Sequence, residues 1–387
     1  MARASLDEWS DRAGAWEISG SNKEFGYLTH GIFRFYGKFP PPVAERFIRE
    51  LHKAVDGPVL DPTVGSGTTA IEAMRLKRDM IGIDVNPLFV MVSRVKTTYV
   101  SPEILREKLG ELELLYRKDH ASDNKFIPKD RNLSHWFYEE TQKEIARVRG
   151  GIESLALSPD ELAVKEFFLV ALAACIRQFS RASRGMGRMF LDPALKPPDV
   201  LGIYSKKARE MILAVSGLEG LGPKPDLRVG VADKTELPAE SVGLVVCHPP
   251  YFNLYRYSSV YKYEQLWLGY DFRGVRRQEI TEGFKLARKE LVENYVHDML
   301  NVLLEARRVL KIGRRCVLLV GDTVIQGEHI PVTSRLLRSI PAKAYEVERL
   351  LIRIPKYTEA SYSAAQRRDK SKVGVKMPDH LLVLRKL

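Results

Sequence analysis

One stretch decides the fold of this chain: Val59-Leu60-Asp61-Pro62-Thr63-Val64-Gly65-Ser66-Gly67-Thr68-Thr69-Ala70. It predicts a short apolar strand, a glycine turn and the start of a helix. A second strand is expected over 80–83 and ends in Asp84. Glycines let the backbone pass close to a ligand beside the helix amino terminus. An acid at the end of the second strand can then hold both hydroxyls of a ribose.

The glycine loop alone leaves two ligand classes open. Gly65-x-Gly67-x-x-Ala70 fits the dinucleotide fingerprint, so a nicotinamide-dependent oxidoreductase is one alternative. The loop is not a Walker loop, because no Gly-Lys-Ser/Thr follows it. Asp61, which precedes the glycines, favours a ligand with a positive amino group over a pyrophosphate.

A second motif lies far downstream, where an apolar run over 242–247 ends in His248-Pro249-Pro250-Tyr251. Two prolines cannot donate to a sheet ladder, so the strand must stop there. A rigid turn at the carboxyl end of a buried strand is where open α/β sheets bind ligands. The turn is suited to binding a flat base through its exocyclic amine. The alternative is that Pro-Pro only ends the strand.

Four segments together carry a resemblance to a known family. Asp61-Pro62-x-x-Gly65-Ser66-Gly67-Thr68-Thr69 is similar to the S-adenosylmethionine loop of the amino-methyltransferases that modify DNA bases. Gly82-Ile83-Asp84-Val85-Asn86-Pro87 resembles the ribose-binding strand end of that family, and Phe35-Tyr36-Gly37-Lys38-Phe39-Pro40-Pro41 resembles the segment that closes over the methionine end of the cofactor. His248 stands where the family has Asp, Asn or Ser before Pro-Pro-Tyr/Phe.

The resemblance implies an α/β, Rossmann-like class I methyltransferase. Its sheet would be mostly parallel and seven-stranded with a terminal antiparallel hairpin, and a mainly helical insertion would be added. The implied cofactor is S-adenosyl-L-methionine. The implied cofactor-binding residues are Phe35, Tyr36, Lys38, Phe39, Asp61, Pro62, Gly65, Ser66, Gly67, Thr68, Thr69, Asp84, Val85, Asn86 and Asp233. Each has a structural alternative: Asp233 could be an ordinary turn residue, Lys38 a solvated charge, and Phe35 and Phe39 packing residues.

The expected catalytic residues are His248, Pro249, Pro250 and Tyr251, and no metal is expected. The lone pair of an exocyclic base amine is delocalised into the ring, so fixed acceptors that bind the amine would help it attack a methyl sulfonium. The expected acceptors are the carbonyl of Pro249 and the side chain of His248. Tyr251 would stack on the extracted base. A neutral imidazole offers one acceptor nitrogen where a carboxylate offers two oxygens.

The expected partner is a nucleic acid. Lys and Arg outnumber Asp and Glu by 61 to 49, a net charge of +12, which fits a polyanion. The expected substrate-binding residues are Phe252, Asn253, Tyr255, Arg256, Arg177, Arg181, Arg184, Arg367 and Arg368. The three arginines from 177 to 184 form a stripe if the helix continues that far, and a solvated face is the alternative. Aromatics alternate with cations from Tyr255 to Tyr263, which suits unstacked bases.

These features favour structured RNA as the substrate. The Pro-Pro-Tyr-Phe-Asn stretch and the order of segments look closest to cytosine-N4 enzymes, and similar archaeal-type relatives act on small-subunit ribosomal RNA. No compact module resembling a DNA target-recognition domain follows the second motif. Site-specific DNA amino-methylation at cytosine N4 or adenine N6 is the alternative.

The 387 residues allow one large domain with a substantial insertion. The expected division is 1–100 with the cofactor loop, 101–225 mainly helical, and 226–387 with the His-Pro-Pro-Tyr motif. Cys175, Cys247 and Cys316 are widely separated on apolar runs and are expected to be buried thiols in a reducing compartment. The polar amino terminus and the shortness of the apolar runs predict a cytoplasmic protein without a membrane partner.

Further elements are expected from periodicity and caps. A helix should begin near Pro42, and Ser101-Pro102 should cap and open another. Further strands are expected over 227–231, 242–247 and 316–321, and a long helix over 292–310. The last two strands, over 344–354 and 380–384, should form the terminal hairpin.

Overall fold

The computed structural model describes residues 14–15, 24–118, 121–158, 161–183, 189–252, 256–280, 291–325, 328–353 and 379–387. Five predicted substrate-binding residues lie outside the described residues: Arg184, Asn253, Tyr255, Arg367 and Arg368.

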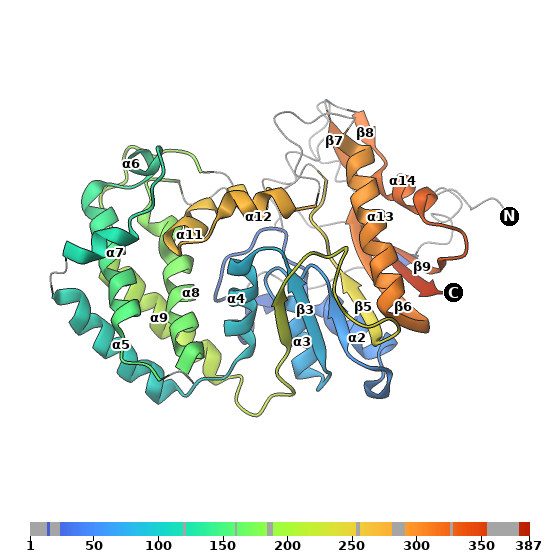
Figure 1. Cartoon of the computed structure of the whole chain (residues 1–387), viewed down its shortest axis with the longest axis horizontal. Helices are drawn as coiled ribbons and strands as arrows, with labels where there is room; N and C mark the ends of the chain where they lie inside the picture. Colours follow the sequence, from blue (N-terminus) through green and yellow to red (C-terminus); the bar gives the residue numbers. More distant parts are fainter. Residues whose placement is uncertain are drawn as a thin grey trace.

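The secondary structure alternates between strands and helices (Figure 1). The strands are β1 (Gly14–Ala15), β2 (Val59–Asp61), β3 (Met80–Asp84), β4 (Asp226–Val229), β5 (Val242–Cys247), β6 (Leu310–Gly321), β7 (Thr323–Ile325), β8 (Glu328–Ile330), β9 (Tyr345–Arg353) and β10 (Asp379–Lys386). The helices are α2 (Pro41–Leu51), α3 (Thr68–Arg75), α4 (Pro87–Thr97), α5 (Pro102–Arg117), α6 (Leu133–Trp136), α7 (Glu139–Ser154), α8 (Leu162–Phe179), α9 (Val200–Ser216), α10 (Tyr257–Val260), α11 (Lys262–Trp267), α12 (Phe272–Gln278), α13 (Leu291–Val309) and α14 (Val332–Ser339). Three short 3₁₀ turns are η1 (Glu24–Gly26), η2 (Ala54–Asp56) and η3 (Ala121–Phe126).

The main sheet has the order β1-β9-β10-β6-β5-β2-β3-β4. Strand β10 is antiparallel to both of its neighbours, and every other neighbouring pair is parallel. Seven strands, β2 to β6 with β9 and β10, form the sheet that the sequence predicts, and the two-residue β1 adds an eighth at the edge. This is the α/β class I methyltransferase fold, and the prediction of fold class is confirmed. The strand order reverses between β2 and β5, so their carboxyl ends border the crevice where such sheets bind ligands.

Alternating side chains of the strands build a core on each face of the sheet. On β10, Leu381 and Val383 pack into the cluster that includes α2 and α3. Leu382 and Leu384 pack into the cluster formed with α13 and α14. This alternation follows from the period of two along a strand, and it explains why the central strands are apolar on both faces.

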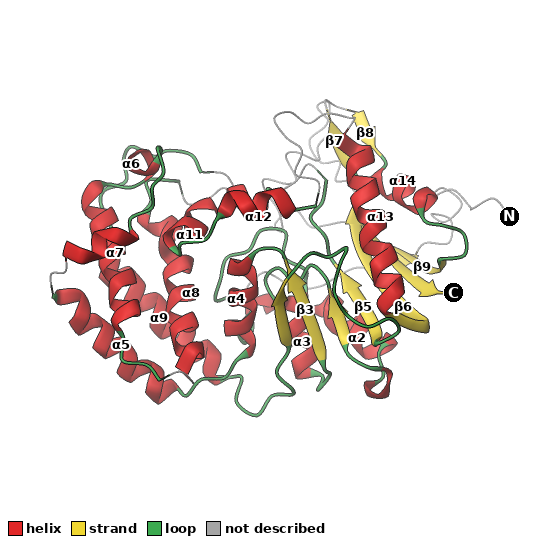
Figure 2. Cartoon of the chain, in the orientation of Figure 1, coloured by secondary structure: helices red, strands yellow, loops and turns green. Residues whose placement is uncertain are grey.

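A third core lies in a group of helices beside the sheet (Figure 2). It joins α4 to α5, α7, α8, α9 and α11, and a bidentate contact from Arg94 on α4 to Glu166 on α8 adds a charged link. Ser101 caps α5 as predicted, because its Oγ accepts from Glu103 N at 3.2 Å. The helices therefore form one body that is attached to the sheet through α4.

The predicted arginine stripe is wrong, because α8 ends at Phe179. Ser180 is extended, and the next backbone N–H, that of Arg181, donates to Trp136 O at 2.7 Å. Arg177 therefore belongs to the helix, while Arg181 lies in the segment beyond it and does not continue the helical face. The three cysteines are buried free thiols, as expected. Among the described residues, no helix combines the length and apolarity needed to cross a membrane.

Two glycines of the fold should respond oppositely to alanine. A Cβ at Gly82 on β3 would lie 2.6 Å from Leu227 Cδ2 and 2.9 Å from Val64 Cγ2, so Gly82→Ala should destabilise the fold by about 1–3 kcal/mol. At Gly110 on α5 nothing lies within 4 Å, so Gly110→Ala should stabilise it by about 0.5–1 kcal/mol. Thermal unfolding midpoints of the two variants would measure this, and a midpoint for Gly82→Ala at or above that of the parent chain would contradict the packing.

Candidate active site

The loop after β2 depends on two glycines that have left-handed backbones. Gly65 has φ 49° and Gly67 has φ 77°. A Cβ at Gly65 would lie 3.1 Å from Phe35 Cζ, and a Cβ at Gly67 would lie 2.8 Å from Ser93 Oγ. Backbone conformation and close approach both require glycine at these positions. The loop is thus pressed between the ring of Phe35 and helix α4.

Helix α4 holds this loop from the protein side. Ser93 Oγ donates to Gly65 O at 3.0 Å, and Lys96 Nζ donates to Ser66 O at 2.9 Å. Lys96 is fully buried, and burial lowers its pKa well below the ordinary value. These two hydrogen bonds hold the carbonyls of Gly65 and Ser66 toward α4. The same two residues line the pocket on the other side of the loop.

Two acids lie at the carboxyl ends of β2 and β3, Asp61 buried and Asp84 half-buried. Asp84 Oδ2 accepts from Gly65 N at 2.9 Å, and its Oδ1 accepts from Asn86 N at 2.8 Å. Asp61 Oδ1 accepts from Thr63 N at 3.0 Å. Burial raises the pKa of Asp61 to about 7 and that of Asp84 to about 6, against the hydrogen bonds, which lower both. A cationic ligand with hydroxyl and amine donors would offset the cost of ionising these acids.

The Pro-Pro turn brings an imidazole beside two aromatic rings. The His248 ring stacks on Phe39 with centroids 5.1 Å apart and an interplanar angle of 28°. Tyr251 meets the same imidazole edge-on at 5.4 Å and 89°. The buried Tyr295 on α13 donates its hydroxyl to Pro250 O at 2.8 Å. The turn is therefore fixed by the sheet before it and by α13 behind it.

One pocket joins the two motifs, with a volume of about 970 Å³ that includes its open mouth. Thirteen predicted site residues line it: Phe35, Phe39, Asp61, Pro62, Gly65, Ser66, Thr68, Thr69, Asp84, Val85, His248, Pro250 and Arg256. Tyr257, from the stretch of aromatics and cations expected to meet bases, also lines the pocket. The lining residues that the sequence did not single out for a role are Gly37, Thr63, Val64, Phe89, Val231, Ala232, Gln278, Glu279 and Ile280.

The remaining described candidates lie beside the pocket or away from it. Gly67, Asn86, Pro249, Tyr251 and Asp233 are chain neighbours of lining residues, and Asp233 is exposed. The Nζ of Lys38 donates to His30 O at 2.9 Å, so this amine is engaged with the backbone. Phe252 is 4% exposed and its ring lies 5.6 Å from that of Tyr295, which makes it a core residue and corrects its prediction as a substrate contact.

The predicted alternation of aromatics and cations has another purpose in the structure. Tyr261 is buried, and its hydroxyl donates to Arg34 O at 3.1 Å and accepts from Tyr36 N at 2.9 Å. Tyr257 donates to Tyr36 O at 2.9 Å, and its ring stacks on Phe35 at 5.3 Å. We call Tyr257 and Tyr261 the tyrosine clamp. Tyr257 and Tyr261 therefore hold the cofactor segment, although Tyr257 also lines the pocket. The regular spacing of these tyrosines did not reveal this long-range pairing.

Comparisons with known proteins agree with this site. Residues 6–94 match the model of a family, N6_N4_Mtase, described as DNA methylase. The type II methyltransferase M.MvaI of Kocuria varians is 26% identical over 213 residues, 51% of this chain and 45% of that protein. The type II methyltransferase M.MjaII of Methanocaldococcus jannaschii is 32% identical over 123 residues, 30% of this chain and 23% of that protein. The chain thus spans less than half the length of these curated relatives.

Solved structures with a similar trace include TrmN from Thermus thermophilus, at 14% identity and a TM-score of 0.36 over 93% of this chain and 52% of that chain. They also include a putative DNA modification methylase from Thermus thermophilus in complex with S-adenosyl-L-methionine, at 20% identity and a TM-score of 0.26 over 41% of this chain and 51% of that chain.

The sheet order gives the chain the class I methyltransferase fold, and the glycine loop between two acids lines a pocket that suits S-adenosyl-L-methionine. Within that class, the match over residues 6–94 and the relatives show that the chain is similar to the N6/N4 amino-methyltransferases. These matches favour a methyltransferase over the nicotinamide alternative that the glycine loop had left open.

Cofactor affinity should depend on pH through the buried carboxyl of Asp61. Asp61 is protonated below its pKa of about 7, and a protonated carboxyl cannot pair with a cationic amine, so affinity should fall about tenfold per pH unit below 7. The stability of the unliganded protein should instead decrease as pH rises. A carboxyl whose pKa is raised in the folded state stabilises the fold at low pH, and this contribution is lost as pH rises through about 7. Calorimetric titration from pH 8 to pH 5.5 measures the first effect. Asp61→Asn is the control and should flatten the dependence, whereas a constant affinity of the parent chain would contradict the assignment.

The hydroxyls of the tyrosine clamp should support cofactor affinity by holding the segment from Arg34 to Tyr36 in place. Tyr261→Phe leaves Tyr36 N and Arg34 O without this hydroxyl, and Tyr257→Phe removes one donor to Tyr36 O. Each change should weaken S-adenosylmethionine binding about two- to tenfold in calorimetry. Tyr263→Phe on the same helical segment is the matched control, because its hydroxyl bonds Asp130 Oδ1 at 3.3 Å. Equal effects of all three changes would show a general loss of packing instead.

Proposed function

We propose that this protein transfers a methyl group from S-adenosyl-L-methionine to an exocyclic amino group of a nucleic-acid base. One observation carries the proposal: the same pocket is lined by the glycine loop with its acids and by His248 and Pro250 of the Pro-Pro turn. Methyl transfer to a base requires that the cofactor and the base amine be held side by side, and these two walls of one pocket can bind one reactant each. Neither an oxidoreductase nor a simple binding module needs the second wall.

The pocket residues fit this cofactor by their donor and acceptor chemistry. Asp84 would accept from the ribose hydroxyls, and Asp61 would accept from the amino group of the methionine part. Gly65 to Thr69 would lie along the cofactor backbone, Phe35 and Phe39 would cover it, and Asp233 would contact the adenine amine. When bound, S-adenosylmethionine supplies a methyl group that its sulfonium already activates.

The residues of the turn would orient the base amine. Because Tyr295 already donates to Pro250 O, the carbonyl we assign to the amine is that of Pro249, and the His248 imidazole is the second acceptor. Both would localise the lone pair of the amine and align it for attack. The stacking of His248 on Phe39 fixes the ring plane, which matters because a neutral imidazole has a single acceptor nitrogen. Tyr251 would stack on the extracted base.

We propose DNA as the substrate, with cytosine N4 as the target atom. The description of the matched family as DNA methylase supports DNA, and the relatives named type II methyltransferases support it too. One argument for RNA also becomes weaker, because two of the tyrosines in the stretch, Tyr261 and Tyr263, are buried and do not offer their rings to unstacked bases. The similarity of the Pro-Pro-Tyr-Phe-Asn stretch to cytosine-N4 enzymes supports the target atom. Residues 101–225 are proposed as a helical region that assists recognition.

His248→Ala should separate cofactor binding from turnover. Its affinity for S-adenosylmethionine should stay within about twofold, while single-turnover methylation of DNA should fall at least about 100-fold, because the amine loses a fixed acceptor. Tritium transfer to a DNA pool gives the rate, and nucleoside mass spectrometry identifies the product. His297→Ala on the exposed side of α13 is the control. A wild-type rate for His248→Ala would remove its chemical role, and methylation of RNA but not DNA would overturn the substrate.

A further inference from the structure

A short basic helix leads directly into the pocket wall. Helix α12 has the sequence Phe272-Arg273-Gly274-Val275-Arg276-Arg277-Gln278 and is capped by Asp271, whose Oδ1 accepts from Arg273 N at 3.1 Å. It packs against α10 and α11 and lies beyond the end of the sheet where the parallel strands terminate (Figure 1). The helix contains three arginines and no acidic residue.

The arginines of α12 share one side of the helix. Arg273, Arg276 and Arg277 are spaced i, i+3 and i+4, which places them together, while Val275 is buried. Arg273 and Arg277 are exposed, the side chain of Arg277 by 73%. The contact between Arg277 and Asp271 is a long one, 4.0 Å between two exposed groups, and such pairs bind weakly.

This basic face borders the mouth of the pocket. The three residues after Arg277, from Gln278 to Ile280, line the pocket, so the last arginine is one residue from its wall. Arg256 lines the pocket as well, and the exposed Arg34 precedes the lining residue Phe35. Cations therefore stand on the rim around the opening through which a base would enter.

We propose that α12 binds the sugar–phosphate backbone of DNA beside the target nucleotide; this rests on the proposed function. The arginines from 273 to 277 span about 6 Å along the helix axis of α12, close to the distance along the duplex axis over which one strand rises by two phosphates, at about 3.4 Å each. The planar guanidinium binds phosphate oxygens bidentately. Phosphate contacts fix register and carry no sequence information, so α12 positions the strand while the pocket selects the base.

The test is the double variant Arg273→Gln/Arg277→Gln, with a fluorescein-labelled DNA duplex as the probe. Two lost phosphate contacts should reduce the slope of log affinity against log salt by about 1.8, which corresponds to about 60-fold weaker binding at about 0.1 M salt and about ninefold at about 0.3 M. Affinity for S-adenosylmethionine and the methylation rate at saturating DNA should stay unchanged.

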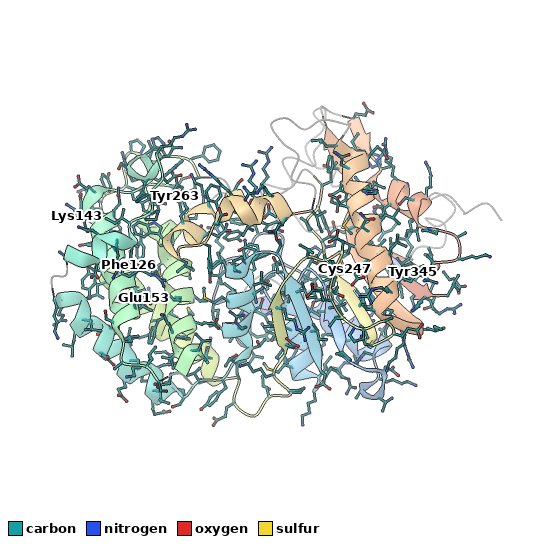
Figure 3. The ribbon with its side chains drawn as sticks, in the orientation of Figure 1. Phe126, Lys143, Glu153, Cys247, Tyr263 and Tyr345 are labelled. Atoms are coloured by element: carbon teal, nitrogen blue, oxygen red, sulfur yellow. The ribbon has the colours of Figure 1, made fainter. Side chains whose placement is uncertain are left out.

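The matched control is Arg106→Gln/Lys143→Gln, which removes the same charge from side chains that are 63% and 52% exposed on α5 and α7. Lys143 lies at the far end of the helical group, away from Cys247 at the end of β5 (Figure 3). The control should change the salt slope by well under 1. An equal loss in both double variants would overturn the proposal, because it would reflect net charge alone.

Three further outcomes also decide the matter. If the α12 variant weakened binding of an RNA of the same sequence but not of the duplex, DNA would be the wrong partner for this surface. If the parent chain methylated DNA while the α12 variant bound DNA with an unchanged salt dependence, the role of α12 in DNA binding would be refuted and the proposed function would stand. If the parent chain transferred no methyl group but showed the α12-dependent slope, the surface would stand and the proposed function would fail.

Discussion

The carboxylate of Asp84 connects the elements on which the site depends. It is the last residue of β3, and its two oxygens accept from the backbone of the glycine loop and from the residue that caps α4. Helix α4 in turn supports the loop through Ser93 and joins the sheet to the helical group. A single half-buried acid thus organises the first wall of the pocket, and desolvation raises its pKa, so hydrogen-bond donors of a ligand would help to stabilise its ionised form.

The second wall is organised from a different part of the chain. Strand β5 stops at two prolines, and Tyr295 fixes the carbonyl of Pro250 from α13. The stacking of His248 on Phe39 joins this wall to the segment before the glycine loop. An Asp, Asn or Ser in place of His248 could not make that ring contact, so this chain has paired an unusual residue in the turn with an aromatic partner in the cofactor segment.

The sequence predicted the parts of the fold that depend on local pattern. The strands β2, β3 and β5 and the terminal hairpin follow from apolar runs and from glycine or proline punctuation, and the cap at Ser101 follows from its side chain. The errors concern residues whose neighbours come from distant parts of the chain. Phe252 is buried by Tyr295, and the hydroxyl of Tyr261 bonds a backbone more than 200 residues away in sequence. Spacing cannot show such contacts, and the same limit hid the role of Glu279, which lines the pocket while accepting from Ser258 N at 2.7 Å and Ser258 Oγ at 2.8 Å.

The tyrosine clamp has a thermodynamic consequence. It fastens the segment from Arg34 to Tyr36 to α10 and α11, which pack against α12, so one continuous set of contacts runs from the wall beside the glycine loop to the arginines at the rim. A ligand at one end of this set of contacts can change the affinity for a ligand at the other end by shifting the conformational equilibrium of the contacts. The second ligand must then change the affinity for the first by the same coupling free energy, since linkage is reciprocal. Any coupling that the clamp carries would therefore favour the second ligand equally in either order of arrival, because the free energy of the fully occupied protein does not depend on which of them came first.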